Sequence, residues 1–216
     1  FGYQDDAETP NTLISVYHYA KAPLIFEVRG LPMKTGMRVM DRYRAAQVGV
    51  VVQCEGGYAH VTENGNAVIY DNDHKKIQTL GNARLELHYK NFVKALHDRK
   101  VVEGLITEAH FSSSLCHLGN ISHLLGAEKT NAAIAEAVKS SEVTKEAFAR
   151  VLGHLKANNL DGDATKTNLG PLLKIDAAKE KFVGSAQEIL TAANHNPLMK
   201  REGRAPFLVP NFQQAT

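Results

Sequence analysis

The sequence contains none of the short motifs that mark common nucleotide-binding and hydrolytic sites. It lacks a Gly-x-Gly-x-x-Gly fingerprint after an expected strand, a P-loop, a Gly-x-Ser-x-Gly elbow and a His-Glu-x-x-His zinc motif. The nearest glycine cluster, Glu55-Gly56-Gly57, has neither the spacing nor the following helix, so it predicts a turn. We therefore expect that this chain binds no nicotinamide cofactor by itself.

Long apolar runs and cysteines are also scarce. No run approaches the ~20 apolar residues of a membrane span, so no membrane partner is expected. Cys54 and Cys116 stand far apart, one in a strand-like run and one in a helix-like run. Two thiols do not make a disulfide framework in a chain of 216 residues, and we predict that both are buried and reduced. The sequence indicates no particular compartment.

Neither sign of charge dominates the chain. There are 25 basic and 23 acidic residues, for a net charge of +2, and neither sign gathers in a block. A nucleic-acid partner is not expected, because it would need lysine and arginine concentrated on one face. The hydrophobic share of 44% and charged share of 22% are typical of a globular domain with one substantial core. The chain begins at Phe1 without a methionine, which suggests a part of a larger polypeptide.

The first half of the chain has the pattern of β-structure. Six runs alternate or are rich in β-branched residues, at 11–19, 24–29, 47–53, 58–63, 67–70 and 76–80. Asn64-Gly65-Asn66 predicts a tight turn, because both residue types tolerate positive φ. The basic, weakly patterned segment 32–45 is interpreted as a mobile connection. Short turns between the strands predict antiparallel pairing.

The strand at 24–29 carries the first candidate site residues. Leu24, Phe26 and Val28 share one face, and Ile25, Glu27 and Arg29 share the other. A charged group in such a strand must meet water, a carboxylate or a ligand. Glu27 is the nearest carboxylate partner for Arg29, and a bound substrate is the alternative. This mixed face is therefore solvent, a substrate wall or an oligomer interface.

The second half of the chain changes to the helical period. Helices are predicted near 85–96, 107–125, 128–138, 144–155 and 186–193, with strands at 172–175 and 181–183. Thr107 and Thr144 are the predicted N-caps, with Ile106 and Phe111 as a hydrophobic staple, and Gly126 is the predicted C-terminal cap. Strands followed by helices predict an α+β fold, an open-faced and largely antiparallel sheet with helices packed on one face.

Ten histidines raise the question of a metal site. His110 and His117 lie seven apart on one predicted helix, but no third ligand stands at a useful spacing. Cys116 and His117 are adjacent, so they point about 100° apart on a helix and cannot act as a pair. The polar run at 158–163 lacks the ligands of a calcium loop. The sequence therefore predicts no catalytic residue and no metal site.

Four stretches together resemble the C-terminal domain of Gfo/Idh/MocA oxidoreductases, in particular glucose–fructose oxidoreductase-like predicted dehydrogenases. They are residues 2–12 (GYQDDAETPNT), 26–31 (FEVRGL), 113–122 (SSLCHLGNIS) and 201–210 (REGRAPFLVP). The resemblance covers essentially the whole of 1–216. It implies an enzyme whose N-terminal Rossmann domain, absent from this chain, binds NAD or NADP and carries the catalytic lysine.

The resemblance implies what this chain contributes to that enzyme. Its C-terminal domain would supply a substrate wall for a sugar or polyol and, through its sheet face, the contact of a homo-oligomer. Arg29 and Glu27 are the first candidates for substrate binding and Asn11 is a weaker one. His110, His117 and Asn120 have no assigned role. The chain alone is expected to bind no cofactor and turn over no substrate. A non-catalytic carbohydrate-binding or self-association domain is the alternative.

Overall fold

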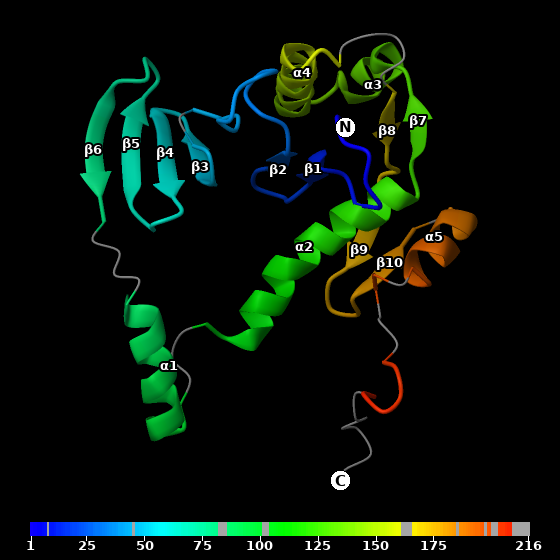
Figure 1. The fold of residues 1–216 in the computed structure, drawn as a ribbon. Helices are drawn as coiled ribbons and strands as arrows, with labels where there is room; N and C mark the ends of the chain where they lie inside the picture. Colours follow the sequence, from blue (N-terminus) through cyan, green and yellow to red (C-terminus); the bar gives the residue numbers. More distant parts are fainter. Residues whose placement is uncertain are drawn as a thin grey trace. The chain divides into compact units, whose positions relative to one another are not determined.

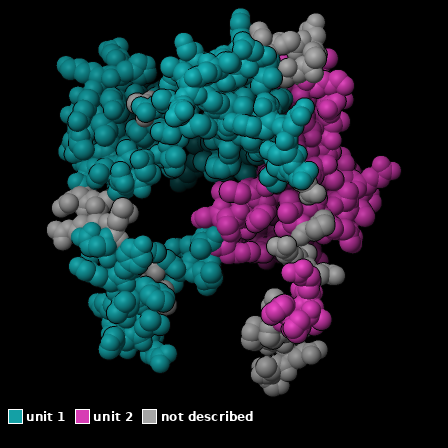
Figure 2. Space-filling model, in the orientation of Figure 1, with its two compact units in different colours: residues 1–109, 142–162 teal, residues 110–141, 163–216 magenta. Residues whose placement is uncertain are grey.

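The computed structural model describes residues 1–7, 9–44, 46–81, 86–100, 104–160, 166–184, 186–196, 198–199 and 203–208. The chain divides into two compact units (Figure 2). Unit 1 comprises residues 1–109 and 142–162, and unit 2 comprises residues 110–141 and 163–216. Leu85, the polar loop beyond 160 and most of the tail after 199 lie outside the described residues, so the expectations placed on them stay predictions.

A strand hairpin covered by one helix forms the core of unit 1. β1 (Thr12–Tyr17) and β2 (Leu24–Arg29) pair antiparallel. α4 (Glu142–Ala157) packs against both strands (Figure 1). Its predicted apolar stripe is confirmed: Phe148, Val151 and Leu155 are 7%, 5% and 1% exposed. Val151 and Leu155 pack on Leu31. Burial of this stripe holds the helix on the hairpin.

A second sheet in unit 1 is built from four consecutive strands. β3 (Gly49–Cys54), β4 (Gly57–Thr62), β5 (Ala67–Asp71) and β6 (Lys76–Leu80) pair antiparallel in chain order (Figure 1). The predicted turn at Asn64-Gly65 is confirmed. The amide of Gly65 donates to the carbonyl of Thr62 over 2.9 Å, and Gly65 has a φ of 75°.

The connection between β2 and β3, residues 30–48, is tied to α4 rather than loose. The amide of Thr35 donates to the carbonyl of Ala157 over 3.1 Å. The side chain of Asn158 donates to the carbonyl of Pro32 over 2.9 Å. Within the connection, the amide of Met33 donates to the carbonyl of Val39 over 2.8 Å. The interpretation of 32–45 as a mobile segment missed the two bonds to the end of α4, because their partners lie more than 120 residues away.

α1 (Glu86–Asp98) forms where a helix was predicted, but its apolar stripe is not buried. Tyr89, Phe92, Val93 and Leu96 are 73%, 65%, 56% and 56% exposed. The helical period therefore located the helix correctly and gave no information about what covers it.

Unit 2 contains most of α2 (Ile106–Leu124), together with α3 (Asn131–Val138) and α5 (Gln187–Asn194). Two short antiparallel pairs accompany them: β7 (Ala127–Lys129) with β8 (Thr167–Leu169), and β9 (Lys174–Asp176) with β10 (Lys181–Val183). Ile121, Phe182 and Ala193 form its buried core.

The predicted helix caps differ from the structure. Thr107 and Thr144 are the second residue of α2 and the third of α4, so neither is an N-cap. Ile106 and Phe111 are 81% and 57% exposed and bury no staple. Gly126 follows α2 without positive φ. A Cβ there would lie 2.8 Å from the carbonyl oxygen of Leu169, so β8 passing close by explains this glycine.

The α+β fold class is confirmed, with open antiparallel sheets and helices. The six strands expected in the first half divide between the β1–β2 hairpin and the β3–β6 sheet. The short pair of β7 and β8 was not predicted, because three residues are too few to show a period of two.

Candidate functional site

Glu27 and Arg29 lie on the face of β2 that α4 covers, within unit 1. Arg29 donates from Nη2 to Oε2 of Glu27 and from Nη1 to Oδ2 of Asp41, each over 2.6 Å. Asp41 belongs to the connection between β2 and β3. The Arg29 side chain is 11% exposed. Both ends of its guanidinium group are therefore engaged by carboxylates of the same chain.

Glu27 extends this network to α4. Nη2 of Arg150 donates to Oε1 of Glu27, and Nε of Arg150 lies 3.5 Å from Oε2. The Glu27 side chain is 15% exposed and that of Arg150 is 25% exposed. The network thus joins three segments, β2, the connection and α4, through two carboxylates and two guanidinium groups. We call Glu27, Arg29, Asp41 and Arg150 the ion-pair network.

The charges of the network support one another despite their burial. Burial alone would raise the pKa of Asp41. Hydrogen bonds from Arg29 and from the Arg42 amide outweigh burial, together with the charges of Arg29 and His154, so the pKa of Asp41 lies below its ordinary value. Burial alone would likewise lower the pKa of Arg29. The hydrogen bonds and charges of Glu27 and Asp41 outweigh burial, so the pKa of Arg29 is raised. Both groups are charged in the folded chain at neutral pH.

His154 lies beside the network with no exposed side-chain surface. Its Nδ1 is 3.2 Å from Oδ2 of Asp41. Neither ring nitrogen makes a hydrogen bond within the part of the chain that the structure describes. Burial lowers the pKa of His154, as does the charge of Arg29, while Asp41 opposes the shift. Burial therefore favours the neutral form of the imidazole.

Aromatic rings and arginines stack beside the network. The guanidinium carbon of Arg150 lies 4.4 Å from the ring centre of Tyr43, and that of Arg44 lies 4.4 Å from the ring centre of Tyr58. Tyr58 in turn stacks on Tyr70, with ring centres 4.9 Å apart and planes inclined by 15°. These contacts fix the connection to one face of the β3–β6 sheet.

The opposite face of the β3–β6 sheet carries two uncharged, partly exposed rows and ends in a third row that contains Asp71. The register aligns two rows across all four strands, one of Val50, Val61, Ala67 and Leu80 and one of Val52, Ala59, Ile69 and Gln78. Val50, Val52 and Leu80 are 55%, 49% and 44% exposed. We call these eight residues the open face. An apolar face of this kind is typical of a contact surface.

Asn11, the third candidate, forms hydrogen bonds with the N-terminal residue, Phe1. Its Nδ2 donates to the carbonyl of Phe1 over 2.7 Å, and its Oδ1 accepts from the Phe1 amino group over 3.0 Å. Its backbone passes so close to Gly30 that a Cβ at Gly30 would lie 2.5 Å from the carbonyl oxygen of Asn11. Asn11 is thus near the end of β2, but it is not part of the ion-pair network.

The histidines of α2 and the two cysteines bear on the remaining expectations. Nε2 of His110 lies 2.9 Å from Oε1 of Glu180, and His117 is exposed on α2. Among the described residues, no three His, Cys, Asp or Glu side chains are grouped to hold a metal ion. Cys54 and Cys116 are both exposed. The prediction of buried thiols is wrong, because one lies at the end of an edge strand and the other on the outer side of α2.

Sequence reasoning missed four participants in this region: Asp41, Arg44, Arg150 and His154. Asp41 is the single carboxylate in a segment that also holds Lys34, Arg38 and Arg42. Such an isolated acid indicates a local partner and was the available signal. Arg150 and His154 lie four apart on α4 beside its apolar stripe, which places them on one side of the helix.

Comparison of the chain with protein-family models, with curated proteins and with solved structures gave no match. The resemblance to the Gfo/Idh/MocA oxidoreductases therefore rests on the four sequence stretches. Among the helices of the described residues, none is long and apolar enough to cross a membrane.

Proposed function

We propose that this chain is the C-terminal domain of an NAD(P)-dependent oxidoreductase of the Gfo/Idh/MocA type that acts on a sugar or polyol. In the complete enzyme an N-terminal Rossmann domain would hold NAD or NADP and the catalytic lysine, and hydride would pass between nicotinamide C4 and a carbinol carbon of the substrate. This chain would supply the oligomer contact and a wall of the substrate site.

The observation that carries the proposal is the open face. Eight aligned positions on four strands carry no charge, in a chain of which 22% is charged. Leaving such a face in water costs about 25 cal/mol for each Å² of apolar surface. Association of two copies through this face would remove that cost symmetrically, because the same patch meets itself across a two-fold axis. A second copy of the chain is thus the proposed occupant.

Because Glu27 and Arg29 are already bound within the ion-pair network, their role at a substrate site would be indirect. Arg29 already donates to two carboxylates and is 11% exposed. Direct recognition of a sugar by these groups would require breaking charge-assisted hydrogen bonds, which is costly in a desolvated site. We therefore assign them a supporting role: they hold β2, the connection and α4 in place behind a substrate wall.

Light scattering on the chain tests the assembly role. We expect the wild type to be at least dimeric at high concentration and Val50→Lys to be monomeric, because a lysine on the open face would be desolvated in the contact. Val39→Lys is the matched control: Val39 is 45% exposed but lies on the connection, so its variant should assemble like the wild type. A monomeric wild type, or equal effects of both variants, would contradict the role.

A second measurement tests the division of labour between domains. The purified chain should show neither NAD(P)H binding by titration nor NAD(P) reduction in the presence of sugars. Turnover by the chain alone would overturn the assignment of the chemistry to another domain. Sugar binding without any cofactor effect would instead support the alternative, a non-catalytic carbohydrate-binding domain.

A further inference from the structure

Arg44 is the unmatched cation beside the ion-pair network. Within the network, the charges of Glu27 and Asp41 balance those of Arg29 and Arg150. His154 is buried and adds no positive charge at neutral pH. No ion pair or hydrogen bond joins Arg44 to another described residue, and its contacts are those with the Tyr43 and Tyr58 rings. The positive charge of Arg44 is therefore not paired with a carboxylate in the part of the chain that the structure describes.

The guanidinium carbon of Arg44 lies over the ring of a buried tyrosine, Tyr58. It lies 4.4 Å from the ring centre of Tyr58, which is 5% exposed and stacked on Tyr70. A guanidinium group that lies on a ring face keeps its N–H edge free for partners in its own plane. Arg44 is itself half-buried. Contact with this buried ring restricts the guanidinium group before any ligand arrives, which lowers the entropy lost on binding.

The backbone of Arg44 is in an unfavourable conformation. Its φ of 48° lies in the left-handed region, which glycine or asparagine would occupy with less strain. The surrounding contacts hold the residue there nonetheless. A residue held in a strained conformation is a candidate for a functional role.

The neighbouring charges favour an anion as well. The other cations of the connection are Lys34, Arg38 and Arg42, all exposed, and none forms an ion pair with a described residue. Its one acidic residue, Asp41, is already bound by Arg29. The unpaired charges of the connection are therefore all positive, which favours an anionic small molecule over a cationic one.

We propose that Arg44, supported by Tyr58 and Tyr70, binds one oxyanion group of a small molecule, a carboxylate or a phosphate ester. Arg44 would donate two parallel N–H bonds to two oxygens of that group, the geometry that favours arginine over lysine. The site stands independently of the proposed oxidoreductase function. Should that function hold, the substrate or an effector would be a sugar acid or sugar phosphate rather than a neutral sugar.

Calorimetric titration of the chain tests the site with inorganic phosphate, gluconate, glucose 6-phosphate and glucose. We expect phosphate and at least one of the two sugar anions to bind, and glucose not to bind. Preference for gluconate or for glucose 6-phosphate would show which oxyanion the site takes. Binding of glucose equal to that of both anions, or no binding of any anion, would overturn the proposal.

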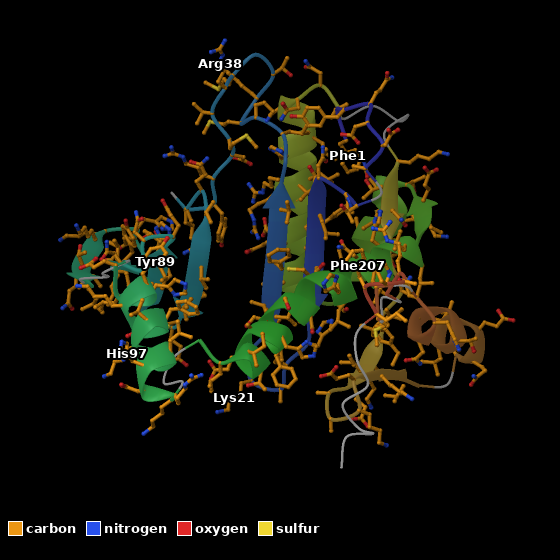
Figure 3. The ribbon with its side chains drawn as sticks, turned by 60° about the horizontal axis from the view of Figure 1, so that its bottom comes forward. Phe1, Lys21, Arg38, Tyr89, His97 and Phe207 are labelled. Carbon is orange, nitrogen blue, oxygen red and sulfur yellow. The ribbon has the colours of Figure 1, made fainter. Side chains whose placement is uncertain are left out.

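Three variants separate the site from general charge. Arg44→Gln should weaken anion binding at least tenfold, and Arg44→Lys should lose part of it because the paired donors are gone. Arg38→Gln removes the same charge from the middle of the connection, in a loop that Figure 3 shows extending away from the β1–β2 hairpin, and should change binding less than twofold. Equal losses of anion affinity in Arg44→Gln and Arg38→Gln would show that anions bind only through unspecific charge attraction. If Arg44→Gln fails to fold, the contrast between Arg44→Lys and Arg38→Gln decides.

Discussion

Nδ1 of His154 lies 3.2 Å from Oδ2 of Asp41, in a position where the imidazole has no exposed surface. The contact joins the end of α4 to the connection between β2 and β3, two segments separated by more than 100 residues. Burial lowers the pKa of His154 from its ordinary value of 6.5 in spite of the neighbouring carboxylate. The fold therefore keeps this histidine neutral where the unfolded chain would protonate it.

The stability of the chain should consequently fall in mild acid. Below about pH 6.5 the unfolded chain binds a proton at His154 and the folded chain does not, so stability is lost as the pH falls from that value through the lowered pKa of the folded state. The slope is at most about 1.4 kcal/mol per pH unit for one such group. Urea unfolding at pH 7, 6 and 5 measures it.

His154→Leu should flatten this dependence without abolishing it. Burial also lowers the pKa of His123 in unit 2, so that residue retains its own share. Asp41, whose lowered pKa starts from 3.8, affects stability only at still lower pH. Identical slopes for wild type and His154→Leu between pH 7 and 5 would show that folding does not lower the pKa of His154.

Asp41→Asn should weaken the tie between the connection and β2. The substitution removes the charge that Arg29 binds over 2.6 Å in a partly desolvated place, and we expect a loss of about 1–3 kcal/mol in the free energy of unfolding. Glu146→Gln is the control, because Glu146 is 63% exposed and 3.9 Å from Arg150. Its loss should stay below about 0.5 kcal/mol. A larger loss in the control would place the important charges on the outer side of α4.

Leu155→Ala should destabilise unit 1 through its core. Leu155 is 1% exposed and packs with Leu31 and Val151, so removing its methyl groups leaves a cavity that costs about 2–5 kcal/mol. Leu172→Ala removes the same atoms from a residue that is 84% exposed. Chemical denaturation should separate the two variants by at least about 2 kcal/mol, and equal midpoints would show that α4 is not packed as described.

Adjacent glycines at the turn between β3 and β4 give a matched pair of backbone variants. Gly57 has a φ of 147°, and a Cβ there would lie 2.8 Å from the Cα of Asp71 on β5. Gly57→Ala should therefore cost about 2 kcal/mol or more. A Cβ on Gly56 would meet nothing within 4 Å, and Gly56→Ala should be close to neutral. Thermal unfolding of both variants measures the difference.

Local pattern was sufficient for much of the fold. The strands at 24–29, 76–80 and 181–183 have the predicted bounds, and the apolar stripe of α4 is buried as expected. These features depend on neighbours within a few residues, where periodicity and turn chemistry act. The Glu27–Arg29 pair was the predicted alternative to a ligand for the same reason: two residues apart on a strand share a face.

The rest of the candidate site depends on contacts between distant residues. Arg150 meets Glu27 across 123 positions of the chain, and no local pattern of either segment indicates that contact. The open face shows the same limit: each strand of the β3–β6 sheet has an ordinary sequence, and only the register aligns their uncharged residues. Arg44 became a candidate only once Tyr58 and Tyr70 were seen to support it.

The mass and peptide map of the native protein, purified from its source cells, test the central claim most directly. The proposed function predicts a subunit heavier than the 23.7 kDa of this chain, with peptides upstream of Phe1 that include a glycine-rich nucleotide fingerprint and the catalytic lysine. A native subunit of 23.7 kDa, without such peptides, would contradict the assignment to an oxidoreductase.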